Sequence, residues 1–431
     1  MKNIVLRDKN GKIYFGWFIV LLGFLVMTLG YVPIVSLTGV FMIPVTTGLD
    51  ISVGNFSIYL MIISIACLTV MSFMGRVIGK GNVKLIMLIS AVLGAISFVG
   101  FGSANTLIAI YLWSIPMGIT FGCLTATPST LLINNWFGPK LRGIALSIAF
   151  GGSTMGGMIM IPTMNWIVQE FGWRVGYYLI AANFIVIVIP AVLLFAVKHP
   201  RDKGMTRIGD LEESEANKAK NEGFMFEEAR RKPLTWLLFL STALVVFSSS
   251  SILAHAQPYL IIQGFSTNAS ASIISLMIGF LTIGSIVAGY YCDKVSLKQG
   301  AAGCAIIFAI CFLGLAAMPT AKWLIVLAII GYAFGSPSVN IISPLLANHM
   351  FGEKDFGTFM GLITLSISLG GTFGGVYVGM IYDITGSYTL GWLTMAVALL
   401  LAAIIRWYCA NQNVRFDLRK VKQRDSEYNL T

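Results

Sequence analysis

The longest uncharged stretch of this 431-residue chain is residues 233–292, which read PLTWLLFLSTALVVFSSSSILAHAQPYLIIQGFSTNASASIISLMIGFLTIGSIVAGYYC. A helix needs about 20 apolar residues to cross a bilayer. The stretch is long enough for two such helices, and the turn-forming residues from Gln263 to Asn268 mark the break between them. This part of the chain is therefore predicted to cross a membrane twice.

Nine further stretches of more than 20 residues contain no Asp, Glu, Lys or Arg, and residues 85–139 are again long enough for two helices. We predict twelve membrane-spanning helices, at about 17–40, 54–76, 84–102, 106–133, 141–166, 173–197, 234–259, 270–291, 298–318, 322–347, 356–381 and 387–409. Only 11% of the residues are charged, against about 25% in soluble domains. The sequence thus predicts an all-α integral membrane protein in two six-helix bundles and excludes a soluble enzyme; we expect no enzymatic activity.

The basic residues predict the orientation. With both termini in the cytoplasm, 27 of the 29 Lys and Arg residues lie on the cytoplasmic side, and only Arg174 and Lys322 lie outside. This predicts a multi-pass protein of the cytoplasmic membrane, whose net charge of +11 meets anionic lipid headgroups and not nucleic acid. The six cysteines show no paired spacing, so we expect no metal and no cofactor.

Residues 198–233 form the one long predicted loop, with nine basic and eight acidic residues. The predicted organisation is a bundle over 1–197, this cytoplasmic linker over 198–233, a bundle over 234–409 and a cytoplasmic tail over 410–431. The two bundles resemble each other at a fixed spacing of 214 residues, at which Pro44 matches Pro258 and Gly156 matches Gly370. Parallel six-helix repeats are typical of one class of secondary transporter, with the substrate site between them.

One repeated motif carries a family resemblance. Residues 289–298 read GYYCDKVSLK, and residues 75–84 read GRVIGKGNVK. The first of these resembles the Gly-x3-Asp-Arg/Lys loop of the major facilitator superfamily, whereas the second has Gly79 in place of the acid. Further similarity to the monocarboxylate and oxalate/formate branch lies in residues 14–17, 136–145, 171–174, 227–236 and 255–260.

The resemblance implies a twelve-helix secondary transporter that works by alternating access. It further implies a small organic anion as substrate, with a monocarboxylate first and a proton as candidate companion, and we expect a monomer. An exporter of amphipathic or drug-like compounds is the alternative. A non-transporting receptor or scaffold is a third reading. In the superfamily, the loop motif implies a role in gating for Asp293, Lys294, Arg142, Arg76 and Gly289, against the alternative of plain topology charges.

The interior of the predicted helices holds few polar groups. No Asp, Glu, Lys or Arg is expected inside a span, because Arg406 is counted with the cytoplasmic tail. The resemblance to oxalate and monocarboxylate carriers implies a basic residue in the eighth helix and, in some members, another in the eleventh. The predicted helices 270–291 and 356–381 contain neither. This departure argues against a dicarboxylate and weakens the case for a monocarboxylate without removing it. An ionisable group within a membrane span is a candidate for function, so His255 is the first substrate or proton candidate, although it could equally be a packing residue. The remaining substrate-binding candidates are Tyr31, Thr127, Tyr332, Asn340 and Tyr377.

Two backbone features are also expected to shape the helices. Prolines should interrupt the first, fourth and tenth helices, and Pro258 should close the seventh. Glycines in the fifth and eleventh helices, including Gly152, Gly156, Gly370 and Gly374, should allow close helix contacts where lipid provides no hydrophobic drive.

Overall fold

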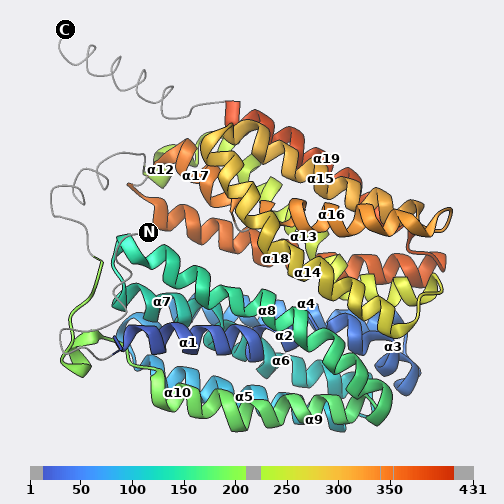
Figure 1. Cartoon of the computed structure of the whole chain (residues 1–431), viewed down its shortest axis with the longest axis horizontal. Helices are drawn as coiled ribbons and strands as arrows, with labels where there is room; N and C mark the ends of the chain where they lie inside the picture. Colours follow the sequence, from blue (N-terminus) through green and yellow to red (C-terminus); the bar gives the residue numbers. More distant parts are fainter. Residues whose placement is uncertain (1–12, 210–224, 340, 353, 412–431) are drawn as a thin grey trace. The chain divides into compact units, whose positions relative to one another are not determined.

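The computed structural model describes residues 13–209, 225–339, 341–352 and 354–411 (Figure 1). In these ranges the chain is helical, and its only β-pairing is an isolated bridge between Phe137 and Ile208. Twelve helices in the described residues are long and apolar enough to cross a membrane, which confirms the predicted number and the all-α membrane fold.

The first six spans run from Gly16 to Phe195. They comprise α1 (Gly16–Val26), η1 (Met27–Tyr31), α2 (Val32–Val35) and α3 (Thr38–Leu49), then α4 (Val53–Lys80), α5 (Val83–Ser103), α6 (Leu107–Leu124) with α7 (Ala126–Trp136), α8 (Pro139–Phe171), and α9 (Trp173–Asn183) with η2 (Phe184–Val188) and α10 (Ile189–Phe195). Two short helices follow outside the spans, η3 (Pro200–Lys203) and α12 (Phe226–Ala229).

The second six spans run from Pro233 to Asn411. They comprise α13 (Pro233–Ile262), α14 (Thr267–Lys294), α15 (Leu297–Ala317), then η4 (Lys322–Leu324), α16 (Ile325–Gly335), η5 (Ser336–Ser338) and α17 (Ile342–Phe351), and finally α18 (Phe356–Thr385) and α19 (Thr389–Asn411).

The repeat spacing is reproduced in the helix bounds. A shift of 214 residues carries α4 (Val53–Lys80) onto α14 (Thr267–Lys294) and α5 (Val83–Ser103) onto α15 (Leu297–Ala317), each at both ends. Gly172 and Gly386, which share this spacing and follow α8 and α18, both have positive φ, 84° and 68°. We call residues at this spacing repeat mates.

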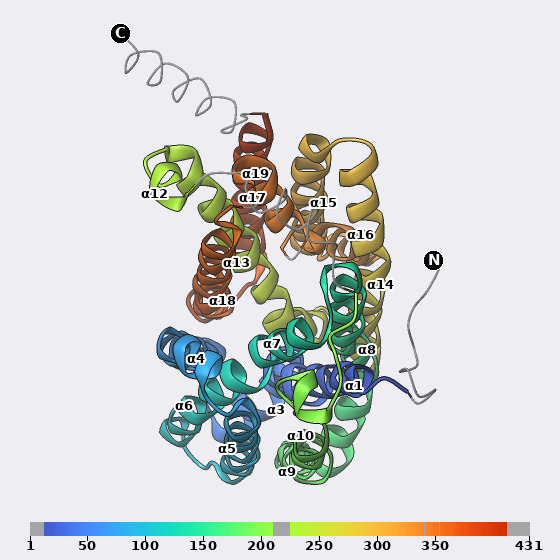
Figure 2. The same ribbon diagram turned by 90° about the vertical axis from the view of Figure 1, so that its left-hand side faces the viewer.

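The described chain separates into two compact units. The first unit comprises residues 1–211, 251–279 and 375–386, and the second comprises residues 212–250, 280–374 and 387–431. The first unit therefore includes one end of each of α13, α14 and α18. Within it α5 packs against α6 and α9, while in the second unit α15 packs against α16 and α19 (Figure 2).

Glycines bring helices together in the same way in both units. A side chain at Gly156 on α8 would collide with Thr28, whose hydroxyl donates to the carbonyl of Gly152 at 2.9 Å. A side chain at its repeat mate Gly370 on α18 would collide with the carbonyl of Ala243 on α13. The expected close contacts are therefore present, and each holds one pair of repeat-related helices.

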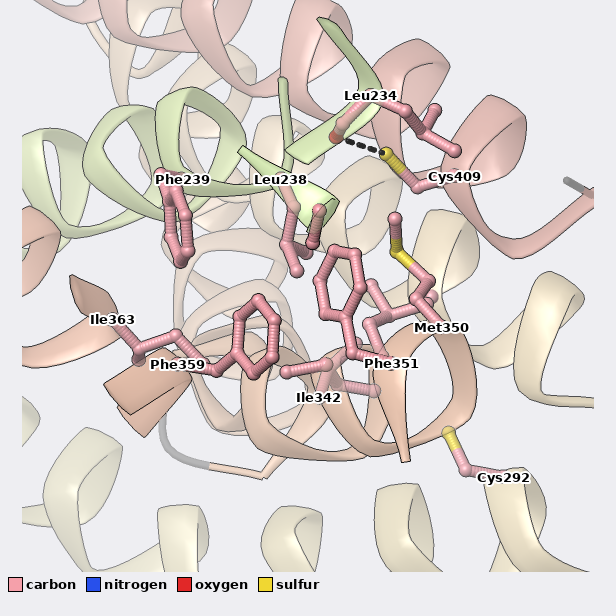
Figure 3. Packing of buried hydrophobic residues seen from close by; sticks show 14 of the residues in the cluster. Leu234, Leu238, Phe239, Cys292, Ile342, Met350, Phe351, Phe359, Ile363 and Cys409 are labelled. Atoms are coloured by element: carbon pink, nitrogen blue, oxygen red, sulfur yellow. Dashed lines mark hydrogen bonds between the residues drawn. The ribbon is translucent and has the colours of Figure 1, made fainter. Parts of the chain in front are cut away.

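An apolar cluster fills the second unit at the end where α13 begins. Figure 3 shows Leu238 of α13, Ile342 and Phe351 of α17 and Phe359 of α18 side by side. The rings of Phe351 and Phe359 stack with centroids 4.2 Å apart. Stacking of these two rings holds α17 against α18, and burial of Leu238 beside them adds α13 to the same core.

Prolines accompany the interruptions, but Pro44, Pro116 and Pro162 lie inside continuous helices. The first span breaks after α2, which contains Pro33, the fourth breaks at Thr125, and the tenth breaks between η5 and α17. Pro258 does not end its helix, because α13 continues to Ile262. Pro258 has no N–H, so it donates no helical hydrogen bond to the carbonyl of Ala254, four residues earlier. Such a loss is tolerated in a membrane helix where neighbouring groups are close. Gly39 of α3 packs against this carbonyl.

Candidate functional site

His255 lies on α13 in the first unit, fully buried with 0% of its surface exposed. Its Nε2 is 2.7 Å from the carbonyl oxygen of Gly375 on α18. Because a carbonyl can only accept, Nε2 carries the hydrogen and donates it. The hydroxyl of Ser57 on α4 is 3.5 Å from the same nitrogen. His255 therefore joins α13 to α18 next to α4, and any proton it gains would bind at Nδ1.

Asp383 of α18 lies in the same part of the first unit. Its Oδ2 accepts a hydrogen bond of 2.9 Å from the backbone N–H of Gly54, the second residue of α4. A carboxylate at this position is stabilised by the positive end of the α4 dipole. Asp383 is also close enough to act electrostatically on the imidazole of His255. A side chain at Gly54 would collide with this carboxylate in its present position.

A chain of amides connects α13, α8 and α14, also within the first unit. Gln257 Nε2 donates to Asn165 Oδ1 at 2.9 Å, and Asn165 Nδ2 donates to Asn268 Oδ1 at 3.0 Å. Gln169 Nε2 donates to the same oxygen at 2.9 Å. Gln257 and Asn165 are buried, so these bonds satisfy polar groups that would otherwise be costly in a membrane. We call Gln257, Asn165, Asn268 and Gln169 the amide chain.

The other substrate candidates of the first unit lie in different surroundings. Tyr31 ends η1, is half-buried, and its ring centroid is 5.8 Å from that of Phe121. Thr127, in the first turn of α7, is exposed. Tyr377 is half-buried on α18, two residues after the carbonyl that His255 contacts.

The second unit holds Tyr332, which is buried on α16 with its ring centroid 5.9 Å from that of Phe308. Asn340 lies outside the described residues. The structure therefore distributes the predicted substrate residues over both units, and His255 is the one with a fully buried ionisable group.

The predicted gating residues lie near helix ends. Arg142 is exposed in the first turn of α8. Gly289 on α14 has open space where a side chain would stand. The side chains of Arg76, Asp293 and Lys294 lie outside what the structure describes, so their gating role stays a prediction.

The sequence analysis missed Arg406, as it missed Asp383 and the amide chain. Counted there as a cytoplasmic topology charge, Arg406 lies within α19 and is fully buried, which corrects the expectation that the spans contain no charge. Its Nη1 donates to the carbonyl oxygen of Ser338 at 3.0 Å and also contacts the Ser338 hydroxyl, and its Nη2 donates to the hydroxyl of Ser343 at 2.9 Å. These serines lie on either side of the break between η5 and α17. The signal available in the sequence was its place inside the predicted helix 387–409.

Within the described residues, no three His, Cys, Asp or Glu side chains are arranged to hold a metal ion.

Comparison with known proteins places the chain in a family. Residues 14–348 and 282–427 match the profile of the Major Facilitator Superfamily. The chain is 22% identical over 346 residues to monocarboxylate transporter 12 of Mus musculus, a match that covers 74% of this chain and 70% of the relative. It is 25% identical over 345 residues to the hexuronate transporter of Bacillus subtilis, covering 74% and 77%.

A solved structure shows the same fold. A bacterial homologue of the human lysosomal transporter Spinster matches with a TM-score of 0.70 at 18% identity, covering 93% of this chain and 98% of that one. The profile match extends over most of the chain, and the twelve spans, their repeat spacing and this fold agree with it. The chain therefore belongs to the Major Facilitator Superfamily.

Proposed function

We propose that this protein is a secondary transporter that carries a small organic anion, with a monocarboxylate as the first candidate, by alternating access. It would work as a monomer in the cytoplasmic membrane with both termini in the cytoplasm, as the distribution of basic residues predicts. The compounds in the names of the two relatives share a chemical group: monocarboxylates and hexuronates each bear one carboxylate on an organic body.

The observation that carries the proposal is the buried guanidinium of Arg406. Among the described residues, its hydrogen-bond partners are two neutral serines, and no described carboxylate pairs with it. A buried charge is costly unless it is paired. A buried positive charge with no described carboxylate beside it favours an anionic cargo over a cationic one.

His255 is the proposed proton site. Its Nε2 is committed to the Gly375 carbonyl, so protonation adds a hydrogen at Nδ1 and places a positive charge in the first unit, with Asp383 as the acid that acts on it. A proton and a substrate anion would then strengthen each other's binding, because linkage is reciprocal. In this way His255 would couple a proton to the transported anion.

Movement between states requires contacts that open and close. The Asp383–Gly54 contact, the His255–Gly375 contact and the amide chain join helices of the first unit at the end where α3 meets α4 and α13 meets α14. We propose that they close the outer end. Asp293 and Lys294, with Gly289, Arg142 and Arg76, would serve the cytoplasmic end, as the family motif implies.

Purified protein in proteoliposomes tests the proposal. Uptake of labelled lactate and of labelled glucuronate should be measured with and without an inward proton gradient, beside a thermal-shift screen that includes amphipathic drugs. Uptake of either carboxylate, stimulated by the gradient, is the expected result. Stabilisation by amphipathic compounds, with no uptake of either carboxylate, would favour the exporter instead.

A further inference from the structure

Arg406 keeps part of its hydrogen-bonding capacity unused. A guanidinium has five N–H groups. Nη1 uses two of them on Ser338 and Nη2 uses one on Ser343, while Nε is buried and has no hydrogen-bond partner among the described residues. The Nε–H therefore remains, and Nη2 has a second N–H. On a guanidinium, the Nε–H and the Nη2–H beside it are parallel and match the two oxygens of a carboxylate.

The nearest helix end adds to the positive potential. Ser343 is the second residue of α17, whose N-cap residue Ile341 has no polar side chain to cap it. The N-terminus of a helix carries a partial positive charge, which favours anions and disfavours cations. The carbonyl of Ser338 offsets part of the guanidinium charge, but a dipole does not neutralise a full charge. Arg406 and the α17 N-terminus together thus favour a bound anion.

The first half of the chain provides an internal control. Its equivalent break, at Thr125, is held by local bonds: the Thr125 hydroxyl donates to the carbonyl of Phe121 at 2.5 Å, and the Ser129 hydroxyl donates to the carbonyl of Thr125 at 2.7 Å. The repeat mate of Arg406 is Val192, which is also fully buried. A broken helix of this kind therefore needs no arginine to hold it, which argues against a merely structural role for Arg406.

We infer that Arg406 is an anion-binding residue that takes a carboxylate, or a planar oxyanion of similar size, on its Nε–Nη2 edge. The assignment rests on the proposed function for the carboxylate to be that of the transported molecule. Because the guanidinium is fully buried, the anion reaches it only when Ser338 and Ser343 move away from α19. Arg406 would thereby sense the anion in one state of the transport cycle.

Thermal unfolding of the purified full-length protein tests the site with three probes: propionate, its neutral isostere propionamide, and nitrate. Wild type should be stabilised by propionate and nitrate but not by propionamide. Arg406→Gln should weaken the apparent affinity for both anions at least about tenfold, since a charge-assisted hydrogen-bond pair is lost. Arg406→Lys keeps the charge without the fork and should fall between the two. Lys298→Gln removes a neighbouring cation, which lies 4.0 Å from the ring of Trp407, and leaves Arg406 and its partners intact. It is the matched control and should bind like wild type.

If Arg406→Gln does not fold, the double variant Arg406→Val with Ser338→Leu is used in its place. This variant copies Val192 and Leu124, which occupy the equivalent positions in the first half. Equal stabilisation of wild type and of the neutral variant by the anions would overturn the assignment, as would a wild type that responds to neither anion. The proposed function is judged separately by uptake. If wild type takes up a carboxylate and Arg406→Gln takes it up equally well, the anion-binding role of Arg406 is wrong but the proposed transport function is supported.

Discussion

The two halves of the chain use the same framework but place different chemistry at equivalent positions. His255 has Phe41 as its repeat mate, and Arg406 has Val192. Phe41 is 2% exposed and stacks on Tyr177 with ring centroids 4.0 Å apart. At these two positions the first half therefore has apolar packing residues, whereas the second half has ionisable groups. The first half forms the equivalent helices without a histidine or an arginine at these positions. The difference between the halves therefore marks both residues as candidates for function.

A second comparison concerns two contacts within the first unit. Asp383 of α18 accepts from Gly54 near the start of α4, while its repeat mate Gln169 of α8 donates to Asn268 near the start of α14. Gly54 and Asn268 are themselves repeat mates. Equivalent positions are thus joined once by a carboxylate at a helix N-terminus and once by neutral amides. The carboxylate contact suits a fixed connection, and the amide contact suits one that breaks more easily.

The largest effect is expected where the halves are alike. Gly156→Leu and Gly370→Leu should each destabilise the protein by about 3 kcal/mol or more, because a side chain would collide with Thr28 or with the Ala243 carbonyl. Gly151→Leu and Gly361→Leu are matched controls, since nothing lies within 4 Å of a Cβ there. Unfolding in mixed micelles measures the difference. Similar losses in all four variants would contradict the packing role of the two glycines.

The next effect separates the halves at His255. His255→Phe copies Phe41 and should fold, and His255→Gln should keep a polar group that can donate to the Gly375 carbonyl. In wild type, the proposed linkage makes substrate affinity fall as pH rises through the range where histidine usually titrates, about pH 5 to 8. His255→Gln should remove that dependence. Binding measured across this range settles the role: identical pH profiles for wild type and His255→Gln would reduce His255 to a packing residue.

Features that depend on single residues or on a fixed spacing could be predicted from the sequence, whereas contacts between distant residues could not. Uncharged stretches predicted every span, because the cost of a charge in a bilayer acts on each residue alone. The repeat spacing predicted which helices would be equivalent. The amide chain and the Asp383–Gly54 contact join residues that are about 90 to 330 positions apart, and no local pattern pairs them. Arg406 was misplaced for a related reason, since only the fold shows that the end of α19 is buried against the broken tenth span.

Asp293 and Gly79 offer a smaller test, because they are repeat mates in the family motif. Asp293→Asn should slow transport several-fold with near-normal expression, since it removes the charge to which the motif assigns gating. Gly79→Asp restores the family pattern in the first half and should be tolerated. Initial uptake rates in proteoliposomes compare the two. Normal transport by Asp293→Asn would end the gating assignment.

The smallest effect is expected from making the two contacts of the first unit alike. Gln169→Asp places at the start of α14 the carboxylate that Asp383 places at the start of α4. The new charge gains about 0.3–1 kcal/mol from the helix dipole. It also loses the hydrogen bond that Gln169 donates to Asn268, which contributes about 0.5–1.5 kcal/mol. The two terms nearly cancel, so unfolding in mixed micelles should change by less than about 1 kcal/mol, whereas Gln169→Ala loses the bond without the compensation and should be the less stable variant. A Gln169→Asp protein less stable than Gln169→Ala would show that a carboxylate is unfavourable at this helix end, and that the two contacts differ in more than the residue that makes them.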